Sequence, residues 1–504
     1  MTQHNESNVS TSITHPIKTP SIRLLFSTLL LVMLLAALDQ TIVSTALPTI
    51  VSELGGMTQL SWVVTAYMLT SAIVVPLYGK FGDLFGRKIV LQIAIVIFLL
   101  GSALCGLAQN MTELILMRAL QGLGGGGLLV VSMAAVADVI PPAERGRYQG
   151  LFGGVFGLAT VVGPLIGGFL VQHFSWRWIF YINLPLGLFA LLVIGAVFQT
   201  GLNRIKRQID YLGAIYLTLA LSCIILFTSE GGTVMPWASL ELWLILAFGL
   251  FSLGGFIYQQ RRAVEPIIPL HLFRQRTFVL SCLVSFIVGM SLFGAMTFLP
   301  LYLQIVKNST PAQAGIQLTP LMGFLLVSSI ISGRIISKTG KYRLFPIVGT
   351  LLAFMAIGLL TTLKISTPMH WLYLYLGVLG FGLGMVIQVL VLAAQNSVES
   401  GLIGVSTSSV TLFRSIGGSM GVAVFGAIFS YGLQRELMMR LPAGTLLPRS
   451  LGSQGVHQLP VILREDYLLS FSQALHLVYL VAAGVTLMGF ILTWFLKNQP
   501  LRKT

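Results

Sequence analysis

The sequence predicts an all-α polytopic membrane protein with fourteen membrane-spanning helices, and two observations carry this prediction. Of the 504 residues, 55% are hydrophobic and only 9% are charged, whereas a soluble domain carries about 25% charged residues. Apolar runs of about twenty residues, the length that crosses the hydrocarbon core of a bilayer, follow one another along almost the whole chain. We therefore expect one membrane-embedded body rather than several soluble domains.

The expected spans fall into two bundles of six helices with two inserted helices between them. In chain order they are Leu24–Leu47, Leu60–Tyr78, Ile89–Leu107, Thr112–Val136, Tyr148–Val171, Trp178–Phe198, Tyr211–Thr228, Leu240–Tyr258, Phe278–Leu301, Ala312–Ile336, Leu344–Leu363, Trp371–Ala394, Val405–Tyr431 and Ala474–Leu496. The corresponding units are a tail at 1–21, a six-helix bundle at 22–199, a two-helix insert at 200–262 and a second six-helix bundle at 263–504, which includes a long outside loop at 432–472.

The distribution of Lys and Arg predicts the orientation of the chain in the membrane. The net charge is +15, and most of the basic residues lie in every second connection between spans. Cytoplasmic loops are enriched in Lys and Arg, so these connections and both termini are expected in the cytoplasm. The positive charge is then explained by membrane topology, and nucleic acid is not an expected partner.

Two connections resemble each other and predict a repeated architecture. The connection after the second span reads GKFGDLFGRK from Gly79, and a later one reads GRIISKTGKY from Gly333. Both have Gly at the first and eighth positions and a basic residue at the second and ninth. Transporters are often built from repeated bundles, and a parallel repeat produces such an echo.

Ionisable side chains within apolar spans are the first candidates for function, because they are costly in a bilayer. Asp39 lies in LDQTIVSTALP of the first span, and Arg118 and Gln121 lie in RALQGLGGGG of the fourth. The two charged residues are at a similar depth, about 10 Å from the outer boundary at 1.5 Å per residue. At Asp39 a proton and a cationic substrate could compete for one carboxylate, as antiport requires. The alternative is a static ion pair that holds two helices together.

A second group of candidates lies at the inner ends of the second and fourth spans. An acid–base network there could hold the inner side in one conformation, if its contacts exist in only one state. The alternative is an ordinary tight turn with cytoplasmic positive charge. The candidates for this latch are Gly79, Asp83, Gly86, Arg87, Lys88, Asp138 and Arg145.

Small residues and polar residues in other spans complete the candidate site. In the fifth span, GPLIGG contains Gly163, Pro164, Gly167 and Gly168, which favour either close helix packing or a hinge. Glu230 follows the seventh span and is expected to be a solvated loop acid, with a cavity role as the alternative. The candidate cavity residues, each of which could instead only pack, are Trp62, Tyr67, Glu230, Phe293, Gln388, Gln395, Asn396 and Arg414.

No motif points to an enzyme, a cofactor or a metal. The run GLGGGG at Gly122 lies within one apolar helix, whereas a phosphate cradle needs a strand before it and a helix after it. No P-loop or catalytic constellation is present in the sequence, so an ion gradient rather than ATP is the expected energy source. A membrane enzyme or sensor would need such a constellation or an added soluble domain.

The motifs together resemble the major facilitator superfamily, and within it the fourteen-helix drug:proton antiporters. GKFGDLFGRK is similar to the inner-loop signature of the superfamily, and LDQTIVSTALP to the first-helix motif of the fourteen-helix branch. RALQGLGGGG resembles the fourth-helix motif, and GLATVVGPLIGGFL the fifth-helix motif of antiporters. WRWIFYINLP, VEPIIPLHLFRQRTF and TLFRSIGGSMGVAV are also similar to patterns of the branch, so the resemblance covers nearly the whole chain.

This resemblance implies alternating access between two bundles around a central cavity. It implies proton-coupled efflux of lipophilic, cationic drugs or antiseptics across a bacterial plasma (inner) membrane. In this resemblance Asp39 and Arg118 are the proton and substrate residues, and Asp83, Arg87 and Asp138 form the latch. The alternative is a dedicated exporter or importer of one endogenous metabolite on the same fold. The second bundle lacks a deep acid, which favours monovalent, neutral or zwitterionic compounds over dications. The expected state is a monomer in the lipid bilayer, and a periplasmic adaptor stays open for a host with two membranes.

Overall fold

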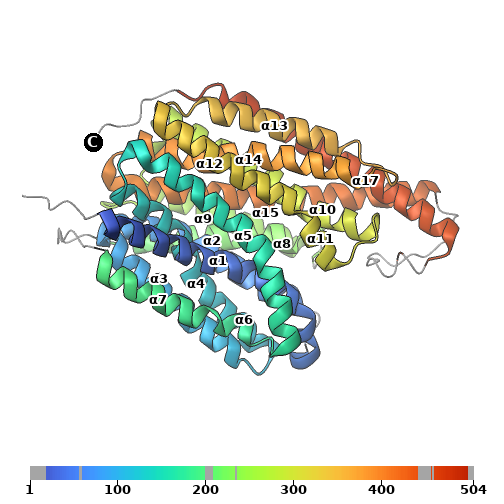
Figure 1. Ribbon diagram of the computed structural model, residues 1–504, viewed down its shortest axis with the longest axis horizontal. Helices are drawn as coiled ribbons and strands as arrows, with labels where there is room; N and C mark the ends of the chain where they lie inside the picture. The colour runs from blue at the N-terminus through green and yellow to red at the C-terminus, as the bar shows by residue number, and fades with distance from the viewer. Residues whose placement is uncertain are drawn as a thin grey trace, which may run out of the picture.

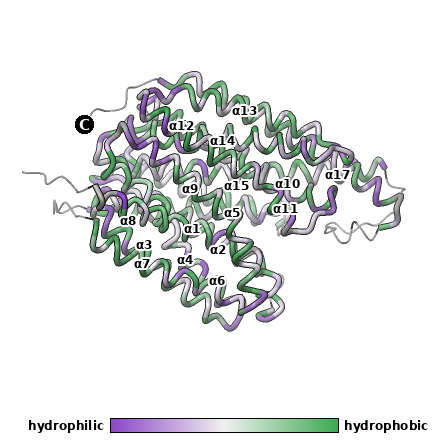
Figure 2. Tube along the Cα trace, viewed as in Figure 1, coloured by the Kyte–Doolittle hydropathy of each residue, from purple (hydrophilic) through white to green (hydrophobic). Residues whose placement is uncertain are grey.

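The computed structural model describes residues 19–55, 59–198, 208–232, 235–440, 456 and 459–497. Within these residues the chain is almost entirely helical, and thirteen helices are long and apolar enough to cross a membrane. A further apolar helix, Leu344–Leu360, is shorter and corresponds to the expected span Leu344–Leu363. The prediction of an all-α polytopic membrane protein is therefore confirmed. Figure 2 shows apolar residues along the middle of the helices and polar residues gathered near their ends.

The first seven helices form the N-terminal half of the molecule, in the lower part of Figure 1. In this half α4 packs against α2 and α3, while α1 packs against α4, α5 and α7. The helices are α1 (Thr19–Leu54), α2 (Leu60–Phe85), α3 (Arg87–Leu107), α4 (Met111–Val139), α5 (Pro142–His173), α6 (Trp178–Tyr181) and α7 (Asn183–Val197).

The C-terminal half lies in the upper part of Figure 1. Its central contacts are α10 with α15 and α14 with α12 and α13, while α17 packs against α10, α13 and α15. The elements are η2 (Leu270–Arg274), α10 (Arg276–Ile305), α11 (Pro311–Gln317), α12 (Thr319–Thr339), α13 (Leu344–Leu360), α14 (Met369–Ser397), η3 (Ser400–Leu402), α15 (Ile403–Arg440) and α17 (Val461–Thr493).

Between the halves, α8 (Tyr211–Glu230) and α9 (Leu240–Gln260) form a hairpin. Helix α8 contacts both α2 of the first half and α15 of the second. The Thr228 hydroxyl of α8 also shares a hydrogen bond with the Ser419 hydroxyl of α15. The insert therefore packs where the two halves meet rather than lying apart from them.

Two expected spans are interrupted, and a proline follows each interruption within three residues. The sixth span breaks at Ile182, between α6 and α7, three residues before Pro185. Proline has no backbone N–H to donate and its ring crowds the carbonyl four residues earlier. The tenth span breaks in the same way at Leu318, between α11 and α12, just before Pro320.

The last two helices are longer than expected. Helix α15 continues to Arg440 and α17 begins at Val461, so the segment 432–472, expected as a loop, is helical over 432–440 and 461–472. At 1.5 Å per residue, the 38 residues of α15 extend about 57 Å, well beyond a hydrocarbon core of about 30 Å. Helix α1 likewise begins at Thr19, inside the expected tail, and the rest of that tail lies outside the described residues.

The two halves meet through α5 against α12 and α14, and through α2 and α4 against α15. Gly146 of α5 and Gly333 of α12 approach so closely that a Cβ on either would press on the carbonyl oxygen of the other. Both glycines lie towards the end of the molecule that carries the α2–α3 and α12–α13 connections, which we call the α2–α3 end. We call the opposite end the α1–α2 end.

Candidate functional site

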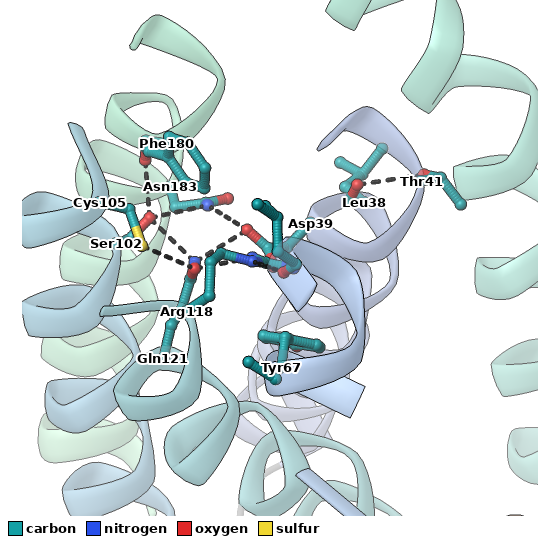
Figure 3. A network of polar contacts seen from close by, with 12 residues as sticks. Leu38, Asp39, Thr41, Tyr67, Ser102, Cys105, Arg118, Gln121, Phe180 and Asn183 are labelled. Atoms are coloured by element: carbon teal, nitrogen blue, oxygen red, sulfur yellow. Dashed lines mark hydrogen bonds and ion pairs between the residues drawn. The ribbon is translucent and has the colours of Figure 1, made fainter. Parts of the chain in front are cut away.

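A buried carboxylate lies inside the N-terminal half, surrounded by α1, α3, α4 and α7 (Figure 3). Asp39 is 0% exposed and Arg118 is 1% exposed. Arg118 Nη1 donates to Asp39 Oδ2 at 2.6 Å and to Gln121 Oε1 at 2.8 Å. Gln121 Nε2 in turn donates to Asp39 Oδ1 at 2.8 Å. The structure thus brings together the three residues that the sequence predicted as a coupling site.

Two further residues of this network were missed by the sequence analysis. Asn183 Nδ2 donates to Asp39 Oδ1 at 3.2 Å and to Ser102 Oγ at 3.0 Å. Ser102 Oγ also accepts from Gln121 Nε2 at 3.1 Å and donates to the Phe180 carbonyl at 2.8 Å. Each is one of the few polar residues in an apolar span, and this is the signal that could have found it, since a buried polar group needs a partner.

The Arg118 guanidinium is held by more than the carboxylate. Its Nε donates to the Val63 carbonyl of α2 at 3.1 Å, and its Cζ lies 4.3 Å from the centre of the Tyr67 ring. Tyr67, a predicted cavity residue, therefore packs beneath the cation, an arrangement that stabilises a desolvated guanidinium. The charges are fully enclosed, so removing either partner would leave the other buried and unpaired, at a cost of about 3–5 kcal/mol.

The glycines of α4 allow this close approach. A Cβ on Gly122 would collide with the Tyr67 carbonyl of α2, and a Cβ on Gly124 would collide with the backbone of Phe98 in α3. The GLGGGG run therefore packs one helix against two others. In a helix surrounded so tightly it cannot form a phosphate-binding loop.

The glycines predicted in α5 pack against the helix that carries Asp39. A Cβ on Gly163 would collide with the Thr41 hydroxyl, and one on Gly167 with the Thr45 hydroxyl. Thr41 Oγ1 also hydrogen-bonds to the Ala159 carbonyl at 3.0 Å. Close packing explains these two positions, whereas Gly168 faces open space within 4 Å. Pro164 lies within the continuous helix α5.

The predicted latch residues meet at the α2–α3 end. Asp83 forms an ion pair with Arg87, whose Nε donates to Asp138 Oδ2 at 3.1 Å. The Asp83 carboxylate also accepts from the backbone N–H groups of Gly404 at 3.0 Å and Val405 at 2.8 Å. These are the first residues of α15, where a carboxylate satisfies free N–H groups and meets the positive end of the helix dipole. Asp83 therefore connects the two halves.

Of the other predicted latch residues, Gly79 and Gly86 shape this contact, while Lys88 and Arg145 each donate to a backbone carbonyl. A Cβ on Gly79 would collide with Ser408 of α15, and Gly86 connects α2 to α3 with a φ of +89°, which favours glycine. Lys88 Nζ instead donates to the Gly195 carbonyl at 2.7 Å. Arg145 Nε donates to the Ile140 carbonyl at 3.0 Å. Both cations thus cap the carbonyl ends of helices, α7 and α4, where they oppose the negative end of the dipole.

Lys80 provides a second contact at this end. Its Nζ lies 2.7 Å from Glu265 Oε2, in the connection from α9 to η2, and Lys80 is buried. The ion pair joins α2 to the segment that leads into the C-terminal half. Neither residue was predicted as part of the latch, because Glu265 is 185 positions away in sequence.

Most remaining cavity candidates lie at helix contacts. Trp62 is half-buried at the start of α2, and Phe293 of α10 lies where a Cβ on Gly418 of α15 would be. Glu230 was expected to be solvated, but this expectation is wrong. It is 8% exposed at the C-terminal end of α8, and Trp237 packs against Gly231 and Gly232 in the turn that follows.

Three polar candidates of α14 lie near the contact between the halves. Gln395 accepts from Gln149 Nε2 of α5 at 2.7 Å and donates to Thr407 Oγ1 of α15 at 2.8 Å. Gln388 lines a small cavity with Gln149 and Ser329 of α12. Asn396 is buried beside Gln395. In the described residues, Gln149 and Ser329 each leave a buried oxygen without a hydrogen-bond partner, so this cavity is polar.

Arg414, the last predicted cavity residue, lies in α15. It is half-buried, and its Nη1 is enclosed without a hydrogen-bond partner among the described residues. Over the same residues, no group of three or more His, Cys, Asp and Glu side chains is arranged to hold a metal ion.

One further ion pair stabilises the α1–α2 end of the N-terminal half. Glu53, near the end of α1, pairs with Arg177 and accepts from Trp176 Nε1 at 2.7 Å. The hydrogen bond from Arg177, followed by that from Trp176, lowers the pKa of the Glu53 carboxyl.

Comparison with known proteins agrees with this fold and site. Residues 29–422 match the Major Facilitator Superfamily, and the chain belongs to this family of membrane transporters. It is 42% identical over 480 residues to an uncharacterized MFS-type transporter of Mycobacterium tuberculosis, covering 95% of this chain and 70% of that protein. It is 39% identical over 409 residues to the multidrug transporter protein MdtP of Bacillus subtilis, covering 81% and 75%.

Solved structures show the same fold. The human organic anion transporter MFSD10 superposes with a TM-score of 0.65 at 16% identity, covering 94% of this chain and 100% of that one. The fold, the family and the relatives make this protein a transporter rather than an enzyme, as the sequence predicted.

Proposed function

We propose that this protein exports lipophilic, cationic drugs across the bacterial plasma membrane by alternating access, in exchange for protons. The observation that carries the proposal is the enclosed Asp39 carboxylate with its partners Arg118, Gln121 and Asn183. An acid inside a membrane helix is costly and is typical of proton and cation pathways. Relatives named as multidrug transporters support the choice of substrate class.

The coupling follows from the charge balance of this network. A single carboxylate faces a permanent cation, Arg118, at 2.6 Å. A proton on Asp39 removes that attraction and leaves Arg118 to its neutral neighbours, whereas a bound cationic substrate would need the charged carboxylate. Proton and substrate then occupy the site in alternation. The described hydrogen-bond partners of Asp39 belong to the N-terminal half, so the site moves as one unit when the halves rock.

The α2–α3 end is the cytoplasmic end in this proposal. It carries the basic connections with Lys80, Arg87, Lys88, Arg145 and Arg147, as the positive-inside rule expects. The contact between Asp83 of α2 and the start of α15 then closes the cytoplasmic side. This contact must break for the inner side to open. Helix α13, of 17 residues, packs between α14 and α17. Counted as a span, it raises the total from thirteen to fourteen, and an even number places both termini in the cytoplasm. A proton gradient supplies the energy, and the protein acts as a monomer.

The test is ethidium efflux from proteoliposomes under an imposed pH gradient, with wild type beside Asp39→Asn. Asn has nearly the same shape but cannot carry the proton. We expect wild type to move dye only with the gradient, and Asp39→Asn to lose at least about 90% of this efflux. Glu241→Gln, which neutralises an exposed carboxylate at the start of α9, is the matched control and should transport normally. Size-exclusion profiles establish that each variant is folded.

Two results would contradict the proposal. If wild type moves no ethidium under any gradient, the multidrug assignment fails and a dedicated transporter of one metabolite becomes the better reading. If folded Asp39→Asn still exchanges dye for protons, Asp39 is a structural ion pair and the coupling site lies elsewhere.

A further inference from the structure

Arg414 is half-buried, and its surroundings differ from those of the buried cations of this protein. Lys80, Arg87 and Arg118 each lie within 3.1 Å of a carboxylate oxygen. Arg414 forms no ion pair with any described residue, and its enclosed Nη1 has no hydrogen-bond partner among them. An enclosed guanidinium nitrogen without a partner inside a membrane helix is expensive, so its presence calls for a ligand that the protein itself does not supply.

Its depth places Arg414 near the middle of the membrane. It lies eleven residues after Ile403, the start of α15, which is about 16 Å along the helix at 1.5 Å per residue. The hydrocarbon core is about 30 Å thick. The guanidinium is therefore too deep to be neutralised by lipid headgroups at either surface.

The helix register directs Arg414 towards the inside of the C-terminal half. Thr407, seven residues earlier on the same face, accepts from Gln395 of α14. Gly418, four residues later, lies against Phe293 of α10. A Cβ on Gly289 of α10 would collide with the Arg414 backbone itself. This face is thus covered by α10 and α14 rather than by lipid.

Those two helices provide no counter-ion. The sequences of α10 and α14 contain no Asp or Glu. The same holds for α12 and α13, and the acids of α15 and α17 lie near their ends at the α1–α2 side, at Glu436, Glu465 and Asp466. The other described acids of this half, Glu265 and Glu399, lie in connections at the α2–α3 end, so no described acid of this half lies at the depth of Arg414.

We propose that Arg414 binds the carboxylate, or another anionic group, of the transported substrate. A guanidinium offers two parallel N–H donors to a carboxylate, which gives both strength and orientation. With Asp39 available for a cationic group in the other half, the substrate class becomes amphipathic zwitterions that carry an amine and a carboxylate. This inference rests on the proposed export function and narrows its substrates.

The experiment uses two dyes that differ at one group. Rhodamine 110 carries a free carboxylate, and rhodamine 123 is its methyl ester. Binding is measured by fluorescence polarisation on purified wild type, Arg414→Gln and Arg414→Lys. We expect Arg414→Gln to bind rhodamine 110 at least about tenfold more weakly, to change rhodamine 123 binding less than about twofold, and Arg414→Lys to recover part of the loss. Arg435→Gln removes an exposed arginine of the same helix and should bind both dyes as wild type does.

The comparison of the two dyes on wild type keeps the test decisive even if Arg414→Gln does not fold. Tighter binding of the carboxylate dye than of its ester supports an anion site, and equal or weaker binding overturns it. Equal losses of both dyes in folded Arg414→Gln would also overturn it, because they would indicate a packing role. Binding needs no pH gradient, so failure of proton-driven export would refute the proposed function without affecting this result.

Discussion

The contact between Asp83 and α15 allows a quantitative prediction about the conformational equilibrium. Asp83→Asn keeps one side-chain oxygen but loses the negative charge. Its bonds to the Gly404 and Val405 N–H groups cross between the two halves. Its ion pair with Arg87 lies within the N-terminal half, so that contact should persist in both conformations and cancel from the equilibrium between them.

The size of the expected shift in the conformational equilibrium follows from the two hydrogen bonds that cross between the halves. A hydrogen bond to a charged group contributes about 1.5–3 kcal/mol, and Asn can replace at most one of the two. We therefore expect Asp83→Asn to destabilise the state with a closed α2–α3 end by about 2 kcal/mol. Since each 1.4 kcal/mol is a factor of ten, this corresponds to about a 30-fold shift towards the state in which this end is open.

The assay is pulsed EPR between spin labels at Arg147 of α5 and Lys338 of α12. Both residues are exposed at the α2–α3 end, and the Arg147 N–H is bonded to the neighbouring Ser337 at 3.1 Å, so the closed state gives a short distance. Asp83→Asn should transfer population to a longer distance. Glu144→Gln, an exposed acid at the same end, should not. An unchanged distance distribution in folded Asp83→Asn would refute the idea that this carboxylate holds the end closed.

Two further predictions test packing and electrostatics. Gly79→Ala should cut ethidium efflux to below about a tenth of wild type, because its Cβ would collide with Ser408 when the halves close. Gly358→Ala, whose Cβ meets nothing within 4 Å, should transport normally. Equal activity of the two variants would contradict this prediction. Because the folded state lowers the pKa of Glu53, its contribution to stability is present above the unfolded value of about 4.5 and is lost as pH falls through the folded value. The melting temperature of Glu53→Gln should therefore fall less than that of wild type between pH 6 and pH 3, and parallel curves would show that the ion pair contributes nothing.

Much of the fold was predictable because it depends on local properties. The apolar runs located the helices to within a few residues at most ends. The breaks before Pro185 and Pro320 were not predictable from proline alone, because Pro48, Pro76, Pro164 and Pro300 lie inside continuous helices. The extent of α15 and α17 was not predictable in this way, because their polar ends at 432–440 and 461–472 lack the apolar character used to recognise a span.

The candidate site was predictable in part. The similar depth of Asp39 and Arg118 permitted their pairing, and the structure shows them in contact. The partners Asn183 and Ser102 could not be assigned, since a polar residue in an apolar span does not indicate which helix it faces. The burial of Glu230 was mispredicted for a related reason, because a polar residue in sequence does not show how the turn beside it packs.

By itself the sequence determined that this chain lies in a membrane, where its helices are and which few charged residues lie within them, because hydrophobic length and the cost of buried charge act residue by residue. Only the tertiary structure decided the partners of those charges. Asp83 meets α15 more than three hundred residues away, Lys88 caps α7 rather than joining the acids, and Arg414 is left without a partner in the described residues. These outcomes depend on how each helix is rotated and which helix packs beside it, and that geometry is set by contacts between distant parts of the chain.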